Sequence, residues 1–241
     1  MTYGNPFVAA ADRYAAGRPY HHARTLGRAL AGRRPRSALD VACGTGLSTR
    51  GLADLGIPAV GTDLVPAMVA RARADTGLPY AVASAEALPV ASGSVELVTV
   101  SSAVHWFGRD RFLAEVARVL RPGGLLLLYE HAGARPADPA YVGWVGDTYL
   151  VRYPAPPRGP MAAAVEPGER FVVERSERWR DEVPFTLAGL VAYLLSQTNL
   201  VDEDPAVVTP WLRAELRPFF PGQEPVPFAF DAGAQLLRLV G

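Results

Sequence analysis

A short stretch after the first predicted buried strand places two glycines where a ligand could bind. Ser37–Val41 is short and apolar, as an inner parallel strand should be, and Gly44 and Gly46 follow it. Glycine lets the backbone turn sharply and approach a ligand, and the helix predicted next points its N-terminus at the same place. The arrangement favours an anionic ligand group. The alternative is an ordinary strand-to-helix turn without a ligand, because so short a motif often occurs by chance.

Asp63 adds a second polar group to this pattern. It ends the predicted strand Ile57–Asp63 and follows Gly46 by 17 residues. At about this separation, an acidic residue accepts hydrogen bonds from ribose hydroxyls in nucleotide-binding strand–helix–strand units. The alternative role for Asp63 is a helix N-cap, for which aspartate is also well suited. Asp40 ends the first strand, close to the glycine turn.

The elements that must position these residues alternate between strand and helix. Such alternation implies crossover connections, a mostly parallel sheet and helices on both faces. We therefore predict a doubly wound, Rossmann-like α/β fold with seven strands. The predicted strands are 37–41, 57–63, 78–83, 95–101, 125–130 and 171–183, with a strand pair or strand-like tail at 226–240; the predicted helices are 7–16, 21–31, 47–55, 66–75, 109–120, 141–151, 187–195 and 205–216. Residues 121–124 are predicted to form a tight turn before the fifth strand.

The regular order breaks after His131, where proline and glycine become frequent. We therefore expect four parts: an N-terminal helical cap segment at 1–32, an α/β core at 33–132, a cap or insertion with the sixth strand at 133–225, and a terminal strand at 226–241 that completes the core sheet. Seven aromatic residues of the cap could line an apolar pocket or pack its own core: Tyr141, Trp144, Tyr149, Tyr153, Trp179, Tyr193 and Trp211.

Composition narrows the classes of partner. The 24 basic and 24 acidic residues balance, so no charge excess favours nucleic acid or an anionic membrane. One cysteine excludes an internal disulfide and fits a reducing compartment. The N-terminus lacks a basic-then-apolar signal pattern, and no run approaches the roughly 18 apolar residues of a membrane span. We expect a cytoplasmic protein without membrane or nucleic-acid partners.

Together these stretches resemble class I S-adenosylmethionine-dependent methyltransferases. Ala38–Gly46 resembles their first motif, Val60–Asp63 their ribose-binding strand end, Ser84–Pro89 their adenine-side loop and Val119–Gly124 the turn before their fifth strand. The set covers roughly residues 36–130 in the expected order. Within the class, the chain is most similar to the small-molecule branch related to trans-aconitate methyltransferase. The features that point there are Tyr14-x-x-x-Arg18-Pro19-x-Tyr20 and Ala103–Phe107.

The resemblance implies a role for each matching residue. Gly44 and Gly46 would contact the methionine part of S-adenosylmethionine, Asp40 would orient that loop or the cofactor's amino group, and Asp63 would hold the ribose. Leu64 would pack on adenine, with Ala85 and Glu86 at its edge. Arg18, with Tyr14, would close over the cofactor carboxylate; the alternative is a surface arginine before a proline. The full set of cofactor residues implied is Tyr14, Arg18, Asp40, Ala42, Gly44, Gly46, Asp63, Leu64, Met68, Ala85, Glu86 and Ser102.

Three positions depart from familiar patterns. Ala42 stands where the methyltransferase motif has its first glycine, and Ser84 stands where the adenine loop starts with an acid. Both departures bear on cofactor affinity. Thr49 occupies the third glycine position of the dinucleotide fingerprint, which disfavours a nicotinamide dehydrogenase.

The implied reaction is in-line displacement of the sulfonium methyl by an O, N or C nucleophile, which leaves S-adenosylhomocysteine. A hydroxyl or an acidic carbon also needs a base. His105 is the first candidate because it lies just beyond the fourth strand and imidazole titrates near neutral pH. The alternative is that His105 and Trp106 form a packed lid. His131 and the pair His21–His22 are weaker candidates, and no histidine–cysteine spacing indicates a metal site.

The predicted acceptor is a small organic molecule, such as a secondary metabolite, and a homodimer is left open. Cys43 is predicted to be simply a small residue in the loop. Two rival hypotheses remain. One is a cofactor-binding protein of the same fold that does not transfer the methyl, such as a cyclase, a rearrangement catalyst or a binding module, since fold does not fix function. The other is an RNA methyltransferase, which would show a basic face and salt-sensitive binding.

Overall fold

The computed structural model describes residues 10–135, 138–155 and 165–241 and divides the chain into two compact units. The α/β unit contains the described residues of 20–131, 158–179 and 232–241, and the helical unit contains those of 10–19, 132–157 and 180–231. These boundaries differ from the predicted ones. Residues 20–32 and 171–179, expected in the cap, belong to the α/β unit, and residues 226–231, expected in the core sheet, belong to the helical unit.

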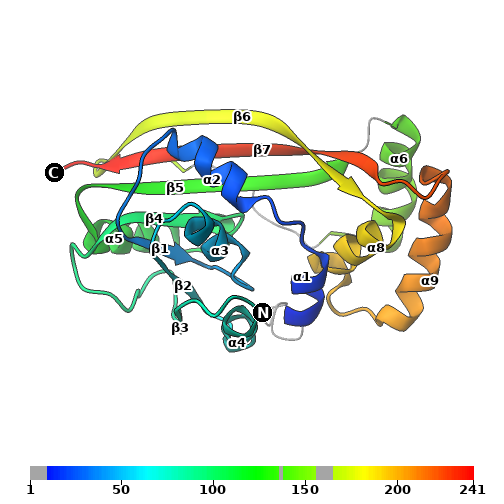
Figure 1. Cartoon of the computed structure of the whole chain (residues 1–241), viewed down its shortest axis with the longest axis horizontal. Helices are drawn as coiled ribbons and strands as arrows, with labels where there is room; N and C mark the ends of the chain where they lie inside the picture. Colours follow the sequence, from blue (N-terminus) through cyan, green and yellow to red (C-terminus); the bar gives the residue numbers. More distant parts are fainter. Residues whose placement is uncertain (1–9, 136–137, 156–164) are drawn as a thin grey trace. The chain divides into compact units, whose positions relative to one another are not determined.

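A seven-stranded, mostly parallel sheet confirms the predicted fold class (Figure 1). Its strand order is β3-β2-β1-β4-β5-β7-β6, and the pairs β1–β2, β1–β4, β2–β3 and β4–β5 are parallel. The bounds are β1 Ala38–Val41, β2 Ala59–Asp63, β3 Tyr80–Val82, β4 Val95–Ser101, β5 Leu120–Arg135, β6 Phe171–Phe185 and β7 Val226–Leu239. Strands β5, β6 and β7 each contain residues of both units.

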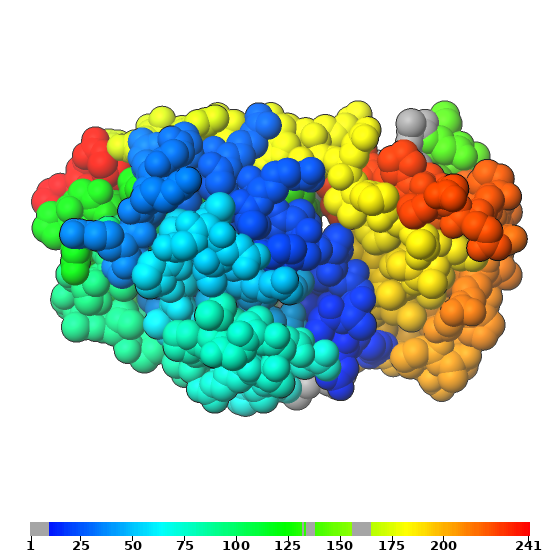
Figure 2. Space-filling view, in the orientation of Figure 1, coloured from blue at the N-terminus to red at the C-terminus, as the bar shows by residue number. Residues whose placement is uncertain are grey.

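Helices cover both faces of the sheet within the α/β unit. On one face, α2 (His22–Leu30) and α3 (Leu47–Asp54) pack over alternate residues of β1, β4 and β5. On the other, α5 (Arg109–Val119) buries Phe112, Val116 and Val119, a spacing that puts them on one side of a helix. α4 (Pro66–Thr76) packs near β2 and β3, and Figure 2 shows the surface that this region forms in cyan.

The register brings the carboxyl ends of the inner strands to one edge. Asp40 of β1 pairs with Gly61 of β2 on one side and with Thr99 of β4 on the other. Parallel strands in such a register place the loops that follow them side by side. The loops after β1, β2 and β4 therefore share one edge of the sheet.

The helical unit, taken by itself, has an aromatic core. Its helices are α1 (Ala11–Gly17), α6 (Pro139–Trp144), α7 (Leu150–Arg152), α8 (Leu187–Leu195) and α9 (Pro205–Leu216), with a π-helical turn at Val145–Tyr149 and 3₁₀ turns at Thr198–Leu200 and Arg217–Phe219. Six of the seven aromatic residues singled out above pack in or against this core, which confirms the packing alternative for them. Trp179 instead belongs to the α/β unit.

One predicted detail was wrong. Residues 121–124 do not form a separate turn but lie inside β5, where the register against β4 shifts between Val95 and Leu97. Gly123 adopts a φ of +73° there, so the backbone irregularity is real but is absorbed into the strand. The end of the chain forms the single strand β7, which confirms the predicted strand-like tail and not the alternative of a strand pair. Among the described residues, no helix is long and apolar enough to cross a membrane.

Candidate functional site

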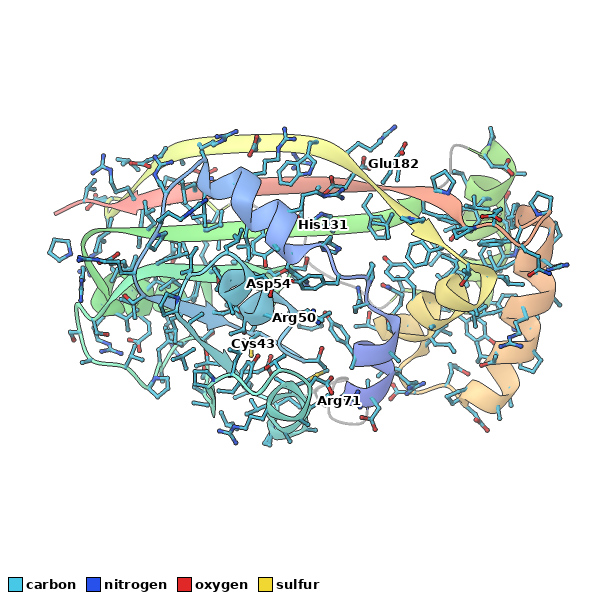
Figure 3. The ribbon with its side chains drawn as sticks, viewed as in Figure 1. Cys43, Arg50, Asp54, Arg71, His131 and Glu182 are labelled. Atoms are coloured by element: carbon cyan, nitrogen blue, oxygen red, sulfur yellow. The ribbon has the colours of Figure 1, made fainter. Side chains whose placement is uncertain are left out.

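The loop after β1 turns through three residues with positive φ. Ala42, Gly44 and Gly46 have φ values of +53°, +56° and +85°. The turn ends at Gly46, which is the N-cap of α3 and provides no side-chain hydrogen bond to the helix. The first N–H groups of α3 therefore lack a side-chain cap at the edge where the strand loops meet, as in sites that bind anionic groups. Figure 3 labels Cys43, which lies in this loop.

Asp40 is fully buried beneath the loop. Its Oδ2 accepts hydrogen bonds from the hydroxyls of Ser48, at 2.5 Å, and Thr49, at 2.6 Å, and its Oδ1 accepts one from Thr99, at 2.8 Å. Burial raises the pKa of Asp40 to about 6, although the three hydroxyls favour the carboxylate. Because these hydroxyls lie on α3 and β4, Asp40 ties the start of α3 to the sheet. This geometry fits the loop-orienting alternative for Asp40.

Asp63 connects the end of β2 to the glycine loop. Its Oδ2 accepts a hydrogen bond from the backbone N–H of Gly44, at 2.8 Å, and its Oδ1 accepts one from the N–H of Val65, at 2.9 Å. Burial raises the pKa of Asp63, and the backbone N–H groups partly oppose that shift. The N-cap of α4 is Val65, so the N-cap alternative for Asp63 is wrong. The carboxylate is held at the edge of the loop.

Two further residues of the loop, Thr45 and Gly46, have surroundings that the sequence motif alone does not predict. The side chain of Thr45 is 2% exposed, and its hydroxyl oxygen has no hydrogen-bond partner within the described ranges 10–135, 138–155 and 165–241. A Cβ on Gly46 would overlap the hydroxyl of Tyr80 and lie 3.0 Å from the Cβ of Ala72. Packing therefore explains glycine at this position. The ligand contact expected of Gly46 stays a prediction.

The residues expected on the adenine side differ in exposure. Leu64 is 61% exposed, whereas Met68 and Ala85 are buried. Glu86 hydrogen-bonds the hydroxyl of Ser84, and its Oε1 accepts from the N–H of Gly108 at 2.8 Å. Burial alone would raise the pKa of Glu86, but these hydrogen bonds outweigh it and lower the pKa. Leu64 thus offers an apolar surface at the loop, and Glu86 fixes the chain after β3 to the start of α5.

A small pocket lies at the carboxyl end of β4, beside residues 128–130 of β5, with room for about one water molecule. Its polar lining residues are Ser102, His105 and Glu130, and the others are Val100, Ala103, Val104, Leu128 and Tyr129. Ser102 has a φ of +50°, and its N–H donates to the carbonyl of Tyr129 at 2.9 Å, which fixes the chain at the mouth of the pocket. Two predicted site residues, Ser102 and His105, are thereby brought together.

Glu130 is a pocket residue for which sequence reasoning assigned no role. It is 7% exposed and follows the apolar run Leu125–Tyr129. A buried carboxylate directly after an apolar run is costly, and that position was the available signal. The ring of His105 lies 5.1 Å from that of Trp106, which is 50% exposed. The structure thus gives His105 both a place in the pocket and an aromatic neighbour.

The remaining predicted residues lie elsewhere. His21, His22 and His131 meet on the α2 side of the sheet and do not line the pocket. Tyr14 and Arg18 belong to the helical unit. There, the guanidinium carbon of Arg18 lies 4.5 Å from the centre of the Tyr14 ring, and Nη2 donates to the carbonyl of Ser196 at 3.2 Å. Arg18 is therefore packed within its own unit and is not a free surface arginine.

Comparison with known proteins agrees with this geometry. Residues 39–128 match the model of a family described as "Methyltransferase domain". An uncharacterized methyltransferase of Mycobacterium bovis is 39% identical over 50% of this chain and 49% of its own length. A ubiquinone/menaquinone biosynthesis C-methyltransferase of Acidiphilium cryptum is 35% identical over 65% of this chain and 64% of its own. The chain thus spans about half the length of the first curated relatives that it matches.

A solved structure extends the likeness beyond the matched domain. The structure of a putative type II methyltransferase from Anaeromyxobacter dehalogenans is 27% identical, with a TM-score of 0.67 over 92% of this chain and 97% of that one. The family match lies within the α/β unit and includes Asp40, Asp63 and His105. The sheet order, the glycine loop and these matches together make residues 39–128 similar to a methyltransferase domain.

Proposed function

We propose that this protein is an S-adenosylmethionine-dependent methyltransferase that methylates an O, N or C nucleophile of a small organic molecule. The observation that carries the proposal is the hydrogen bond between the Asp63 carboxylate and the N–H of Gly44. It places an acceptor for ribose hydroxyls directly against a glycine loop whose following helix lacks a side-chain cap. The family match supports the same activity.

The residues of the loop fit this cofactor. The buried Thr45 hydroxyl, which has no partner within the described part of the chain, suits a site that completes its hydrogen bonds with a polar ligand. Asp63 would hold the ribose, Leu64 would cover the adenine, and Gly44 and Thr45 would face the methionine part. Ala42, Gly46, Met68, Ala85 and Glu86 would shape this site around them.

The cofactor would supply the methyl group, and the pocket would supply the proton acceptor. When bound, S-adenosylmethionine supplies an electrophilic methyl group on a sulfonium. His105 would accept a proton from the acceptor, since it lines the pocket at the carboxyl end of β4. Ser102 and Glu130, which line the same pocket, would orient the acceptor beside His105.

The proposed acceptor is small and largely apolar. The pocket has room for about one water molecule, so it would receive only the reacting group of the acceptor, beside five apolar or aromatic residues and three polar ones. Some relatives are named as C-methyltransferases of ubiquinone and menaquinone biosynthesis, so we include aromatic carbon among the acceptor atoms. Because the sequence also resembles the branch related to trans-aconitate methyltransferase, we include small carboxylic acids among the proposed acceptors. A setting in secondary metabolism and a homodimer are parts of the same proposal.

Incubation with S-adenosylmethionine labelled in its methyl group tests this function. The acceptor panel should contain phenols, quinols, small carboxylic acids and amines, and both labelled product and S-adenosylhomocysteine should be measured. We expect both to form with at least one class of acceptor, and both to fall together in an Asp63→Asn variant. Binding of the cofactor without labelled product from any class would favour the rival reading of a binding protein that does not transfer the methyl.

A further inference from the structure

The carboxylate of Glu86 joins two loops of the α/β unit. Its Oε2 accepts a hydrogen bond from the hydroxyl of Ser84, and its Oε1 accepts one from the backbone N–H of Gly108 at 2.8 Å. Ser84 and Glu86 lie in the loop after β3, whereas Gly108 follows β4 and is the N-cap of α5. This side chain therefore ties the loop expected beside adenine to the chain that leads into α5.

Apolar side chains from the same two loops also pack together. Ala85 and Leu88, on either side of the carboxylate in the chain, are buried in the same cluster as Ala103 and Phe112. Phe107 packs against that cluster, and its ring centre lies 4.8 Å from that of Phe112. The loop after β3 and the chain from 103 to 112 therefore share one close-packed core, through which a shift of one is felt by the other.

The chain between β4 and α5 carries part of the small pocket. Ala103, Val104 and His105 line the pocket, and the last two lie in the 3₁₀ turn Val104–Trp106. The N–H of Trp106 donates to the carbonyl of Ala103 at 3.0 Å, and the N–H of Phe107 donates to that of Val104 at 3.2 Å. The glycine held by the carboxylate follows Phe107 directly, so this hydrogen bond fixes the end of the turn.

The surroundings of Glu86 favour its charged form. Burial opposes the charge, but the hydrogen bonds from Ser84 and Gly108 and the nearby charge of Arg111 outweigh it and lower the pKa of Glu86. The carboxylate also lies at the N-terminus of α5, where the positive end of the helix dipole favours an anion. Both hydrogen bonds therefore have a charged acceptor, which makes them stronger than bonds between neutral groups.

We propose that Glu86 is a positioning residue that links the cofactor site to the acceptor pocket. Adenine bound beside Ala85 and Glu86 would order the loop after β3 and, through the hydrogen bond to Gly108, the turn that carries His105. Such a link requires the cofactor to bind more tightly to the ordered loop, and it is reciprocal, so an acceptor in the pocket would also tighten cofactor binding. The inference rests on the proposed function and adds that the cofactor prepares the pocket for the acceptor.

Two substitutions at Gly108 isolate this link. Gly108 has a φ of −69°, and the preceding Phe107 is extended, with a φ of −93° and a ψ of 151°, so the backbone suits a proline. Gly108→Pro removes the N–H donor and displaces the Glu86 carboxylate from it. Gly108→Ala is the matched control, because it keeps the donor and its added Cβ would lie 3.6 Å from Oε1 of Glu86, an ordinary van der Waals contact. Neither variant replaces a residue expected beside adenine.

Hydrogen exchange of the backbone amides, followed by nuclear magnetic resonance with and without S-adenosylhomocysteine, tests the link in the whole chain. Calorimetry on the same samples sets the saturating ligand concentration for each protein. We expect the ligand to slow exchange at Trp106 and Phe107 by about tenfold in the wild type and in Gly108→Ala, and by less than about twofold in Gly108→Pro. Exchange at Gly46, whose N–H donates to the carbonyl of Cys43 at 3.0 Å, should slow equally in all three proteins.

The outcomes distinguish the link from the proposed function. Equal slowing at Trp106 in all three proteins, or none in a wild type that binds the ligand, would overturn the link and leave the proposed function intact. A wild type without calorimetric binding would overturn both. If Gly108→Pro does not fold, Glu86→Gln and Glu86→Ala take its place: Glu86→Gln retains an acceptor for Gly108 and should keep the slowing, whereas Glu86→Ala should lose it. Equal slowing in these two variants would likewise contradict the link.

Discussion

The carboxylate of Asp63 accepts a hydrogen bond from the backbone N–H of Gly44 across 2.8 Å, and so joins the end of β2 to the loop after β1. The same side chain also accepts a hydrogen bond from the N–H of Val65, so each of its two oxygens is hydrogen-bonded to the backbone. A group placed in this way can both shape the loop and offer its remaining lone pairs to a ligand. The two roles make distinct predictions, because one affects stability and the other affects binding.

Replacing Asp63 with Asn should weaken binding of S-adenosylhomocysteine by roughly 10- to 100-fold, as expected when a charged acceptor of hydrogen bonds is lost. Isothermal titration calorimetry measures the change. The matched control is Asp75→Asn, which removes an exposed carboxylate that pairs with Arg71 at 2.7 Å. An Asp63→Asn protein that folds and binds as tightly as this control would remove Asp63 from the ribose.

Ala42 occupies a left-handed conformation that glycine adopts without cost, with a φ of +53°. Ala42→Gly should therefore raise the free energy of unfolding by about 1 kcal/mol, or the melting temperature by about 2–4 °C. In Ala70→Gly, on the exposed side of α4, the same chemical change should lower stability by about 0.5–1 kcal/mol. If both substitutions changed stability in the same direction, backbone strain at Ala42 would not determine its effect.

Burial raises the pKa of Asp40 to about 6 in the folded protein. The pKa of aspartate in the unfolded chain is about 4, so between these pH values the folded state binds more protons than the unfolded state. This contribution to stability therefore grows as the pH falls from 6 to 4 and is lost as the pH rises. Asp40→Asn should reduce the change in the free energy of unfolding between pH 6 and pH 4 by up to about 3 kcal/mol. Urea unfolding of both proteins at pH 4, 5, 6 and 7 measures the difference. If the free energy of unfolding depended on pH in the same way in both proteins, the prediction would be contradicted.

His105→Gln separates the two roles open to this residue. If His105 accepts a proton from the acceptor, turnover should fall by roughly 100-fold or more while cofactor affinity stays within about threefold. Stopped assays of labelled product, with calorimetry on the same samples, give both quantities. His21→Asn, outside the pocket, is the histidine control. Equal loss of turnover and affinity, with altered tryptophan fluorescence, would instead support the lid formed with Trp106.

Local pattern predicted most of the fold. The strand Val95–Ser101 and the helices Leu187–Leu195 and Pro205–Leu216 match their predicted bounds, because apolar periodicity, Thr186 and Asp204 as N-caps, and proline mark them clearly. The length of β5 was not predicted, since the Pro-Gly-Gly of 122–124 is a turn signal locally and only pairing with β4 makes it an irregular strand. The division into units was not predictable either, because it depends on contacts distant in sequence.

The site was predicted less completely. Asp40, Asp63 and the glycines are found from spacing, but spacing does not reveal that Tyr80 requires glycine at position 46 or that Thr45 buries its hydroxyl. Glu130 was given no role, because its burial cannot be read from the sequence. The rings of His21 and His131 meet although these residues are 110 positions apart in the chain, and no periodic pattern links them.

The central claim is that the glycine loop and Asp63 form a site for S-adenosylmethionine. The most direct measurement is a calorimetric titration of the unmodified protein with S-adenosylhomocysteine, and separately with NAD. We predict saturable binding of S-adenosylhomocysteine at one site per chain, with a micromolar dissociation constant, and no binding of NAD. Saturable binding of NAD without any response to S-adenosylhomocysteine would contradict the assignment.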